Sequence, residues 1–453
     1  MFSVLFFCAG VQAGVFEYRF SNGLKLLVKE DHRAPVVVSQ VWYKIGSSYE
    51  YDGLTGISHA LEHMMFKGTK THPPGEFSRI ISANGGRENA FTGSDYTAYF
   101  QTLEKSRLKV SFELESDRMR NLSLPAAEFK KEIEVVKEER RWRTEDKPQA
   151  YTREVAFATA YQTSPYRHPV IGWMADLEAM KIADVRDWYR QWYAPNNATL
   201  VVVGDVDPEA VHSLAKKYFA GLKPEKITIQ EPRPEVPQAG VKRITVKRPA
   251  EVPYLLMGYK VPVLKTTLKQ SPTVAEWEPY ALDVLAGVLD GGSSARFASR
   301  LIRGQEIAAS VGAGYDMTDR LDTLFVISGT PSQGHTTAQL EQAITAELKA
   351  LQANPVDEKE LERVKAQVVS GDVYQRDSVF YQAMILGNLE TVGLSWRLAD
   401  EYVGRIQSVT GEQVQQVARK YFNNDRLTVA VLEPQPMDKQ RRRPRAGVPH
   451  HAY

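Results

Sequence analysis

The chain has 453 residues, of which 43% are hydrophobic and 25% are charged. These values are typical of a globular protein, and the length predicts two or more domains because a single hydrophobic core rarely serves so many residues. The 57 basic and 55 acidic residues leave a formal charge of +2, which argues against nucleic acid as the main partner.

The segment from Met1 to Ala13 is apolar and ends in Val-Gln-Ala before Gly14. This pattern resembles the apolar region and small-residue cleavage site of a signal peptide, so we expect a periplasmic or secreted protein. A buried first strand in a cytoplasmic protein is the alternative. Cys8 is the only cysteine, which excludes an intrachain disulfide and a thiolate metal site. We expect no membrane span, because no other stretch approaches the ~18 apolar residues that a span needs.

Residues 36–43 are apolar and β-branched and predict a strand. The pentad at 59–63 reads His-Ala-Leu-Glu-His. On a helix, His59 and His63 lie on one face, close enough to bind one metal ion, and Glu62 lies on the same side. The order His-x-x-Glu-His is a motif of catalytic zinc sites. An amphipathic helix with surface histidines is the alternative.

Catalytic zinc needs a third protein ligand and an open fourth position. Residues 95–102 predict a second strand, and residues 128–143 predict a helix that Pro125 opens. Glu132 and Glu139 are two turns apart on this helix and share a face. One of them can bind the metal while the other supports a ligand. A charge run of this kind is otherwise typical of a solvated helix face.

The two halves of the chain carry a loose internal repeat. Residues 192–203 and 421–431 each contain an aromatic helix end, a turn with Asn, and a β-branched strand. We therefore expect an α+β protein of two homologous domains, each a mixed sheet with helices on one face. The expected divisions are a signal peptide at 1–13, a zinc-binding domain at 14–224, a Pro-rich linker at 225–245, a second domain at 246–436 and a basic tail at 437–453.

The first half resembles the pitrilysin family of zinc metallopeptidases, and bacterial processing-peptidase-like subunits within it. The resemblance is carried by the run Gly53-x-x-Gly56-x-x-His59-x-x-Glu62-His63-Met64-x-Phe66-Lys67-Gly68-Thr69 and by Glu132-x6-Glu139. It implies that His59, His63 and Glu139 bind one zinc ion, that Glu132 supports a ligand from behind, and that Glu62 is the general base.

Residues 85–92 (Gly-Gly-Arg-Glu-Asn-Ala-Phe-Thr) are similar to the active-site strand of the same family. This similarity implies that Asn89 and Ala90 bind an extended peptide substrate by strand addition. Without the resemblance, Asn89 would be interpreted as a turn residue before a strand.

The second half departs from the family pattern. Active single-chain members contribute an Arg-x6-Tyr pair that contacts substrate near the zinc, but this spacing after Arg296, Arg300 or Arg303 gives no tyrosine. Either Tyr315 replaces the missing tyrosine through a local shift, or another subunit supplies the pair. We therefore expect a heterodimer with a related subunit that lacks the zinc motif and carries the Arg/Tyr pair, with a homodimer as the alternative.

The resulting hypothesis is a zinc-dependent endopeptidase that hydrolyses extended or unfolded peptides enclosed between the halves of a clamshell. Glu62 would take a proton from the zinc-bound water and pass it to the leaving amine. A non-catalytic scaffold subunit of a processing-peptidase-like complex is the alternative, and a metal-storage or regulatory site is a further one.

Overall fold

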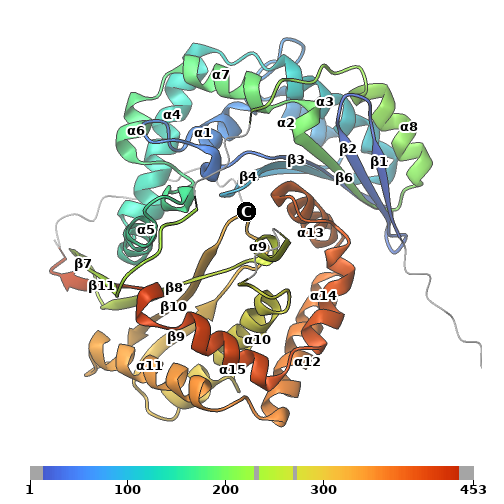
Figure 1. Cartoon of the computed structure of the whole chain (residues 1–453). Helices are drawn as coiled ribbons and strands as arrows, with labels where there is room; N and C mark the ends of the chain where they lie inside the picture. Colours follow the sequence, from blue (N-terminus) through green and yellow to red (C-terminus); the bar gives the residue numbers. More distant parts are fainter. Residues whose placement is uncertain (1–13, 229–233, 269–272, 438–453) are drawn as a thin grey trace, which may run out of the picture.

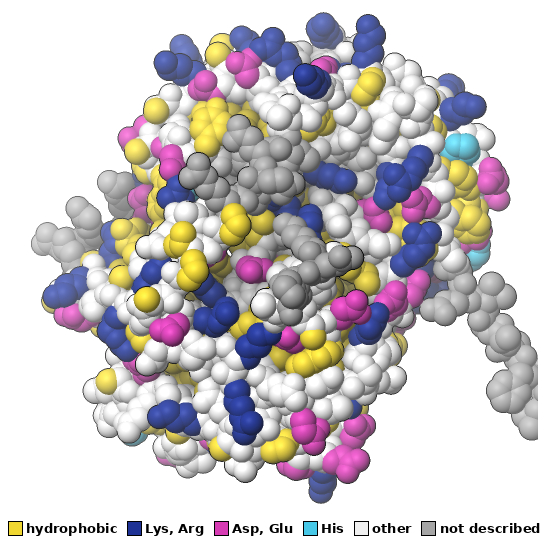
Figure 2. Space-filling model, in the orientation of Figure 1, with side chains coloured by type: hydrophobic (Ala, Val, Ile, Leu, Met, Phe, Trp, Pro, Cys, Tyr) yellow, Lys and Arg dark blue, Asp and Glu magenta, His cyan; other side chains and the backbone are white. Residues whose placement is uncertain are grey.

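The computed structural model describes residues 14–228, 234–268 and 273–437. Two domains face each other as a clamshell, each built on one β-sheet (Figure 1). The expected signal peptide and residues 438–453 of the expected tail lie outside the described residues. Within the described ranges, no helix is long and apolar enough to cross a membrane. Figure 2 shows basic and acidic side chains interspersed over one face of the molecule.

The first domain is a six-stranded mixed sheet in the order β1-β2-β6-β3-β5-β4 with helices around it. Its strands are β1 (Val15–Arg19), β2 (Lys25–Glu30), β3 (Val36–Tyr43), β4 (Arg87–Thr92), β5 (Thr97–Glu104) and β6 (Ala198–Gly204). Its α-helices are α1 (Ile57–Met64), α2 (Glu76–Ala83), α3 (Leu108–Asn121), α4 (Ala126–Arg140), α5 (Pro148–Ala160), α6 (Met174–Ala179), α7 (Ile182–Trp192) and α8 (Pro208–Phe219).

The second domain is a five-stranded mixed sheet in the order β7-β11-β8-β10-β9. Its strands are β7 (Lys242–Pro249), β8 (Tyr254–Val261), β9 (Ala308–Gly314), β10 (Thr323–Pro331) and β11 (Leu427–Gln435). Its α-helices are α9 (Leu264–Leu268), α10 (Glu278–Asp290), α11 (Thr337–Ala353), α12 (Glu358–Gln375), α13 (Val379–Val392), α14 (Leu398–Gln407) and α15 (Gly411–Tyr421). Strand β7 begins inside the range 225–245 that was expected to be a linker.

The two sheets repeat one topology, which confirms the prediction of two homologous domains. The order β2-β6-β3-β5-β4 matches β7-β11-β8-β10-β9. Within these orders β2-β6 and β7-β11 are parallel, and all other pairs are antiparallel. The repeated sequence segments occupy equivalent places. Helix α7 ends at Trp192 before β6, and α15 ends at Tyr421 before β11, each through a short 3-10 turn.

The predicted elements of the first half are present, with shifted ends. Strand β3 has the predicted bounds. Strand β5 begins at Thr97, two residues later than predicted, because residues 93–96 form the turn from β4, in which the Gly93 N–H donates to the Tyr96 carbonyl at 2.8 Å. Helix α4 ends at Arg140 and continues as a π-helical turn over Arg141–Glu145.

Each sheet is covered on its second face by a helix from the other domain. Helix α5 packs on β7, β8 and β11, and α13 packs on β3 and β6 (Figure 1). Every residue of β6 is consequently buried, and its sequence from Leu200 to Val203 is a continuous apolar run rather than an alternating one. The predicted helices on one face correspond to the helices of the same domain, and the helix on the other face was not predicted.

Glu235, in the segment between the two domains, bonds to both of them. The Glu235 carboxylate accepts hydrogen bonds from the backbone N–H groups of residues 162–164 of the first domain, at 2.9–3.1 Å. It also pairs with Lys260 Nζ of β8 at 2.7 Å. These donors outweigh the effect of burial and lower the pKa of Glu235 to about 2.

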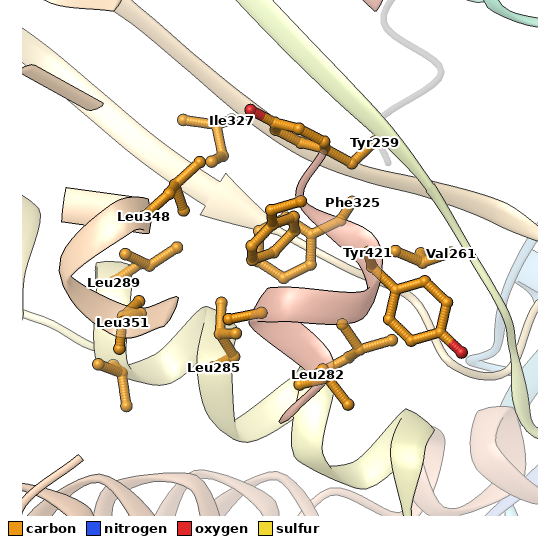
Figure 3. Packing of buried hydrophobic residues seen from close by; sticks show 14 of the residues in the cluster. Tyr259, Val261, Leu282, Leu285, Leu289, Phe325, Ile327, Leu348, Leu351 and Tyr421 are labelled. Carbon is orange, nitrogen blue, oxygen red and sulfur yellow. The ribbon is translucent and has the colours of Figure 1, made fainter. Parts of the chain in front are cut away.

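Helix α10 is the counterpart of α1. Helix α1 contacts α4, α7 and β4, and α10 makes the equivalent contacts with α12, α15 and β9. Figure 3 shows Leu282, Leu285 and Leu289 of α10 gathered with aromatic side chains from β10 and α15. Both helices contribute to the hydrophobic core of their own domain, and only α1 also carries histidines.

Candidate metal centre

Helix α1 is anchored at its first turn by a buried carboxylate. Glu50 accepts hydrogen bonds from the backbone N–H groups of Gly56 at 2.7 Å and Ser58 at 2.8 Å, which have no partners within the helix. Burial raises the pKa of Glu50 to about 7. Gly56 has φ of 82°, and a Cβ there would lie 2.6 Å from the Ile171 carbonyl oxygen, so the turn into α1 requires glycine. The start of the helix is therefore held in one position.

Three side chains from α1 and α4 converge on one point. His59 and His63 are one turn apart on α1, with ring centroids 4.8 Å apart. Glu139 of α4 faces both: its Oε1 lies 3.7 Å from His59 Nε2, and its Oε2 lies 3.3 Å from His63 Nε2. Helix α4 begins after Pro125 at its N-cap and packs against α1. All three predicted ligands thus come together.

The spacing of these donors suits a tetrahedral ion. Ligand atoms about 2.0–2.1 Å from a tetrahedral zinc lie about 3.3 Å from one another. The two distances between Glu139 and the histidines are 3.3 and 3.7 Å, and one ligand atom from each residue lies within 4.8 Å of the others. Two imidazoles and one carboxylate are also a donor set that zinc favours, so the residues present fit the metal.

The two histidines are held in different protonation states. Burial and the charge of His63 lower the pKa of His59 to about 3, so His59 is a neutral ligand. Burial acts the same way on His63, but its hydrogen bonds to Glu132 and Glu139 outweigh it and raise the pKa to about 9. A proton on Nε2 of His63 therefore competes with a metal for this nitrogen, which faces Glu139.

Glu132 holds His63 from behind, as expected for a supporting residue. Its Oε2 lies 3.3 Å from His63 Nδ1, which leaves Nε2 directed at Glu139. Lys67 Nζ pairs with Glu132 Oε1 at 2.6 Å, and Arg143 pairs with Glu139 Oε1 at 2.8 Å. The hydrogen bond from His63 and the charges of His63 and Arg143 outweigh burial and lower the pKa of Glu139 to about 2, so the carboxylate is ionised.

Glu62 lies beside this cluster on α1 and is 8% exposed. Its Oε2 accepts a hydrogen bond from the Thr92 hydroxyl at the end of β4. Burial raises the pKa of Glu62, which makes its carboxylate a stronger base. A buried, oriented carboxylate next to three metal donors can take a proton from water and return it.

Asn89 and Ala90 lie on β4, which is the edge strand of the first sheet. They pair with Phe100 and Tyr99 of β5, and the Ala90 N–H is 2.9 Å from the side-chain oxygen of Asn89. Helix α1 contacts this strand, so the edge lies next to the candidate metal centre. An edge strand offers backbone groups that an added peptide strand can pair with.

Tyr315 and the three arginines of the second domain have partners within that domain. The Tyr315 hydroxyl donates to the Pro262 carbonyl at 2.6 Å, and its ring stacks on Phe325. The arginine contacts are Arg296 with Glu360 at 2.7 Å, Arg300 with Glu347 at 2.7 Å, and Arg303 with the Ser293 carbonyl. In this conformation these side chains stabilise the second domain.

Four further residues that shape the centre were not predicted from the sequence. Arg143 lies four residues after Glu139, so helical spacing could have paired them. Lys67 and Thr92 were inside the quoted motifs without an assigned role. Glu50 precedes α1 by a loop, and no local periodicity relates it to the helix that it caps.

Comparison with known families assigns both halves of the chain. Residues 25–172 match the family described as "Insulinase (Peptidase family M16)". Residues 179–368 match the family described as "Peptidase M16 inactive domain". The second match begins at the end of α6, so it includes α7, β6 and α8 of the first domain and the second domain as far as α12.

Individual proteins are similar over nearly the whole chain. The zinc protease PqqE of Helicobacter pylori is 32% identical over 430 residues, which cover 91% of each protein. The uncharacterized zinc protease YmxG of Bacillus subtilis is 25% identical over 92% of this chain and 98% of its own length. The crystal structure of a protease from Helicobacter pylori superposes with a TM-score of 0.87 at 29% identity, over 93% of this chain and 100% of that one. With both M16 domain types in sequence and full-length similarity to these proteins, the chain belongs to peptidase family M16.

Proposed function

We propose that this M16 protein is a pitrilysin-type, zinc-dependent endopeptidase that cleaves extended or unfolded peptides. The observation that carries the proposal is the convergence of His59, His63 and Glu139 beside the buried carboxylate of Glu62. The relatives named zinc proteases in Helicobacter pylori and Bacillus subtilis support the same chemistry.

One zinc ion, held by His59, His63 and Glu139, would supply Lewis acidity that lowers the pKa of a water molecule towards about 7 and polarises a peptide carbonyl. Glu132 occupies Nδ1 of His63 and so would keep Nε2 of this ring available to bind the ion. Arg143 keeps Glu139 ionised and in place.

Glu62 would act as the general base. The Thr92 hydroxyl binds one carboxylate oxygen and leaves the other to accept the proton of the attacking water. Glu62 then donates this proton to the amine of the departing fragment, so that the carboxylate is regenerated.

The edge strand β4 would hold the substrate. A peptide added in extended form beside Asn89 and Ala90 would have its backbone groups paired without its sequence being read. This mode of binding favours unfolded segments, because a folded protein does not offer a free strand.

We further propose that the active form includes a related subunit that supplies the missing Arg/Tyr pair. The engagement of Arg296, Arg300 and Tyr315 within the second domain supports this assignment over a local shift of Tyr315. If the purified chain is as active alone as with a co-expressed paralogue, the partner is not needed. In size-exclusion chromatography a homodimer would elute at the mass of two copies of this chain, whether or not the paralogue is present.

Export to the periplasm is proposed from the apolar segment 1–13. Cell fractionation with N-terminal sequencing of the mature protein would locate it. A mature chain that keeps Met1 in the cytoplasm would contradict export.

The central experiment measures zinc and peptide cleavage in the same preparations. Atomic absorption should give one zinc per chain. Glu62→Gln should keep the zinc and lower cleavage of quenched fluorescent peptides by about 10²- to 10⁴-fold. Glu138→Gln is the matched control, since this carboxylate is on α4 but faces solvent and pairs with Arg141. If Glu62→Gln cleaves as well as the parent, the mechanism is wrong. Bound zinc without cleavage, alone or with a paralogue, would favour the scaffold subunit.

A further inference from the structure

An arginine of the second domain is buried inside the first. Arg320 lies in the loop between β9 and β10 and is 5% exposed, and its main partner Asp95 is 3% exposed. Asp95 belongs to the turn between β4 and β5 of the first domain. Burying a charge pair between domains costs desolvation free energy, which its hydrogen bonds have to offset. The partners in these bonds show which segments the pair connects.

Arg320 binds two segments of the first domain at once. Its backbone N–H and Nε donate to the two oxygens of Asp95 at 3.0 and 3.3 Å. Its Nη2 donates to the carbonyl and hydroxyl oxygens of Ser48 at 3.2 and 3.0 Å. The guanidinium lies 4.1 Å from the ring centroid of Tyr49. Arg320 therefore joins the turn of β4 and β5 to the short helix at residues 47–49.

Each of these segments is connected to Glu62 or to its helix through one neighbouring residue. Thr92, whose hydroxyl binds Glu62, is three residues before Asp95. Glu50, whose carboxylate anchors the first turn of α1, directly follows Tyr49. The two segments are also bonded to each other, because the Ser48 N–H donates to the Ser94 carbonyl at 2.7 Å. A displacement of Arg320 would therefore move the Glu62 carboxylate both through Thr92 and through the first turn of α1.

We propose that Arg320 is a positioning residue through which the docked second domain fixes the geometry of the general base Glu62. This inference rests on the proposed function for the role of Glu62. It gives the second domain a direct part in the site on the first. Because a displacement of about 1 Å at a reacting group can lower a rate about 10²-fold, even a modest loosening of these segments should be measurable.

The test uses the full chain with the charge pair removed as a unit. The double variant Arg320→Met with Asp95→Asn takes away the bonds to Ser48 without leaving a buried charge unpaired. The matched control is Lys25→Met with Glu390→Gln. It removes another largely buried ion pair between the domains, which joins β2 to α13 away from Glu62. Backbone hydrogen exchange and kinetics are measured on both.

In the Arg320/Asp95 variant, exchange should become faster in residues 92–98 and 56–60, and kcat should fall about tenfold or more with KM changed less than about threefold. The control should leave these segments and kcat near the parent values. Unchanged exchange in both segments, kcat within about twofold of an active parent, or an equal effect in the control overturns the proposal. Kinetics are measured with the co-expressed paralogue present if the parent alone is inactive. If the zinc-loaded parent cleaves no peptide either alone or with the paralogue, the proposed function fails, and hydrogen exchange alone decides whether Arg320 holds the two segments.

Discussion

The contact between α13 and the sheet of the first domain predicts that one Gly→Ala substitution in a helix lowers stability instead of raising it. Gly387 lies buried in α13, where its backbone rests on the indole of Trp42 from β3. A Cβ at this position would be 2.1 Å from Trp42 Nε1 and 2.2 Å from Cε2. The ring cannot move aside, since it is fully buried, packs edge-on to Phe91 and Tyr96, and donates its N–H to Gln40 at 2.8 Å.

The magnitude follows from two opposing effects. In a helix interior, Gly→Ala is ordinarily favourable by about 1 kcal/mol. Carbon contacts are normally about 3.5–4.0 Å, so the overlap here approaches ~1.5 Å, which places the overpacking cost near the upper end of about 1–3 kcal/mol. We therefore expect Gly387→Ala to lower the free energy of unfolding by roughly 2 kcal/mol.

Gly404 provides the matched control, because it lies on α14 where a Cβ would have no neighbouring atom within 4 Å. Gly404→Ala should raise the free energy of unfolding by up to about 1 kcal/mol. With an unfolding entropy of about 2.1 cal/mol/K per residue, a cooperative transition of this chain should shift by about −2 °C for Gly387→Ala and about +1 °C for Gly404→Ala. Differential scanning calorimetry resolves both. Two shifts of the same sign would refute the packing argument.

Three further results are expected. Removal of the metal with a strong chelator should abolish peptide cleavage, and stoichiometric zinc should restore it; cleavage that survives complete zinc loss would exclude the proposed mechanism. Glu132→Gln should weaken zinc binding about 10- to 100-fold with little effect on the melting temperature of the metal-free chain, as measured by competition with a zinc-binding dye. Glu235→Gln should lower the free energy of unfolding by roughly 1–3 kcal/mol at pH 7. The folded pKa of Glu235 is lowered to about 2, so its stabilisation is complete above the ordinary pKa of about 4.5 and is lost as the pH falls towards 2. The urea midpoints of parent and variant should therefore converge in acid. A constant difference between the two midpoints would contradict this.

Much of the candidate centre could be predicted because its parts are local. The spacing of His59, Glu62 and His63 places them on one side of any α-helix, and the seven-residue spacing of Glu132 and Glu139 does the same on a second helix. The two-domain fold was also predictable, since the repeated segments before β6 and β11 preserve the same order of helix end, turn and strand. The apolar run from Leu200 to Val203 in β6 also indicates burial on both faces of the sheet, which the expectation of helices on one face does not include.

Contacts between distant segments could not be predicted in the same way. Helical and strand periodicities relate residues within one element, and they do not say which loop of the second domain meets which turn of the first. The sequence places Asp95 at the start of a strand, but it lies in a turn and binds Arg320, which is 225 positions away. Glu50, Thr92 and Arg320 have no spacing that relates them to α1.

The sequence by itself determined the candidate donors, the proposed base and the repeated order of elements, because helix spacing, the family resemblance and the internal repeat are all properties of the sequence. The tertiary structure alone decided that Glu139 faces both histidines while Glu132 holds His63, and that each sheet is covered by a helix of the other domain. It also decided that Arg320 reaches the segments next to Glu62. These arrangements depend on how whole domains pack, where burial and hydrogen bonding over the entire chain select one set of partners.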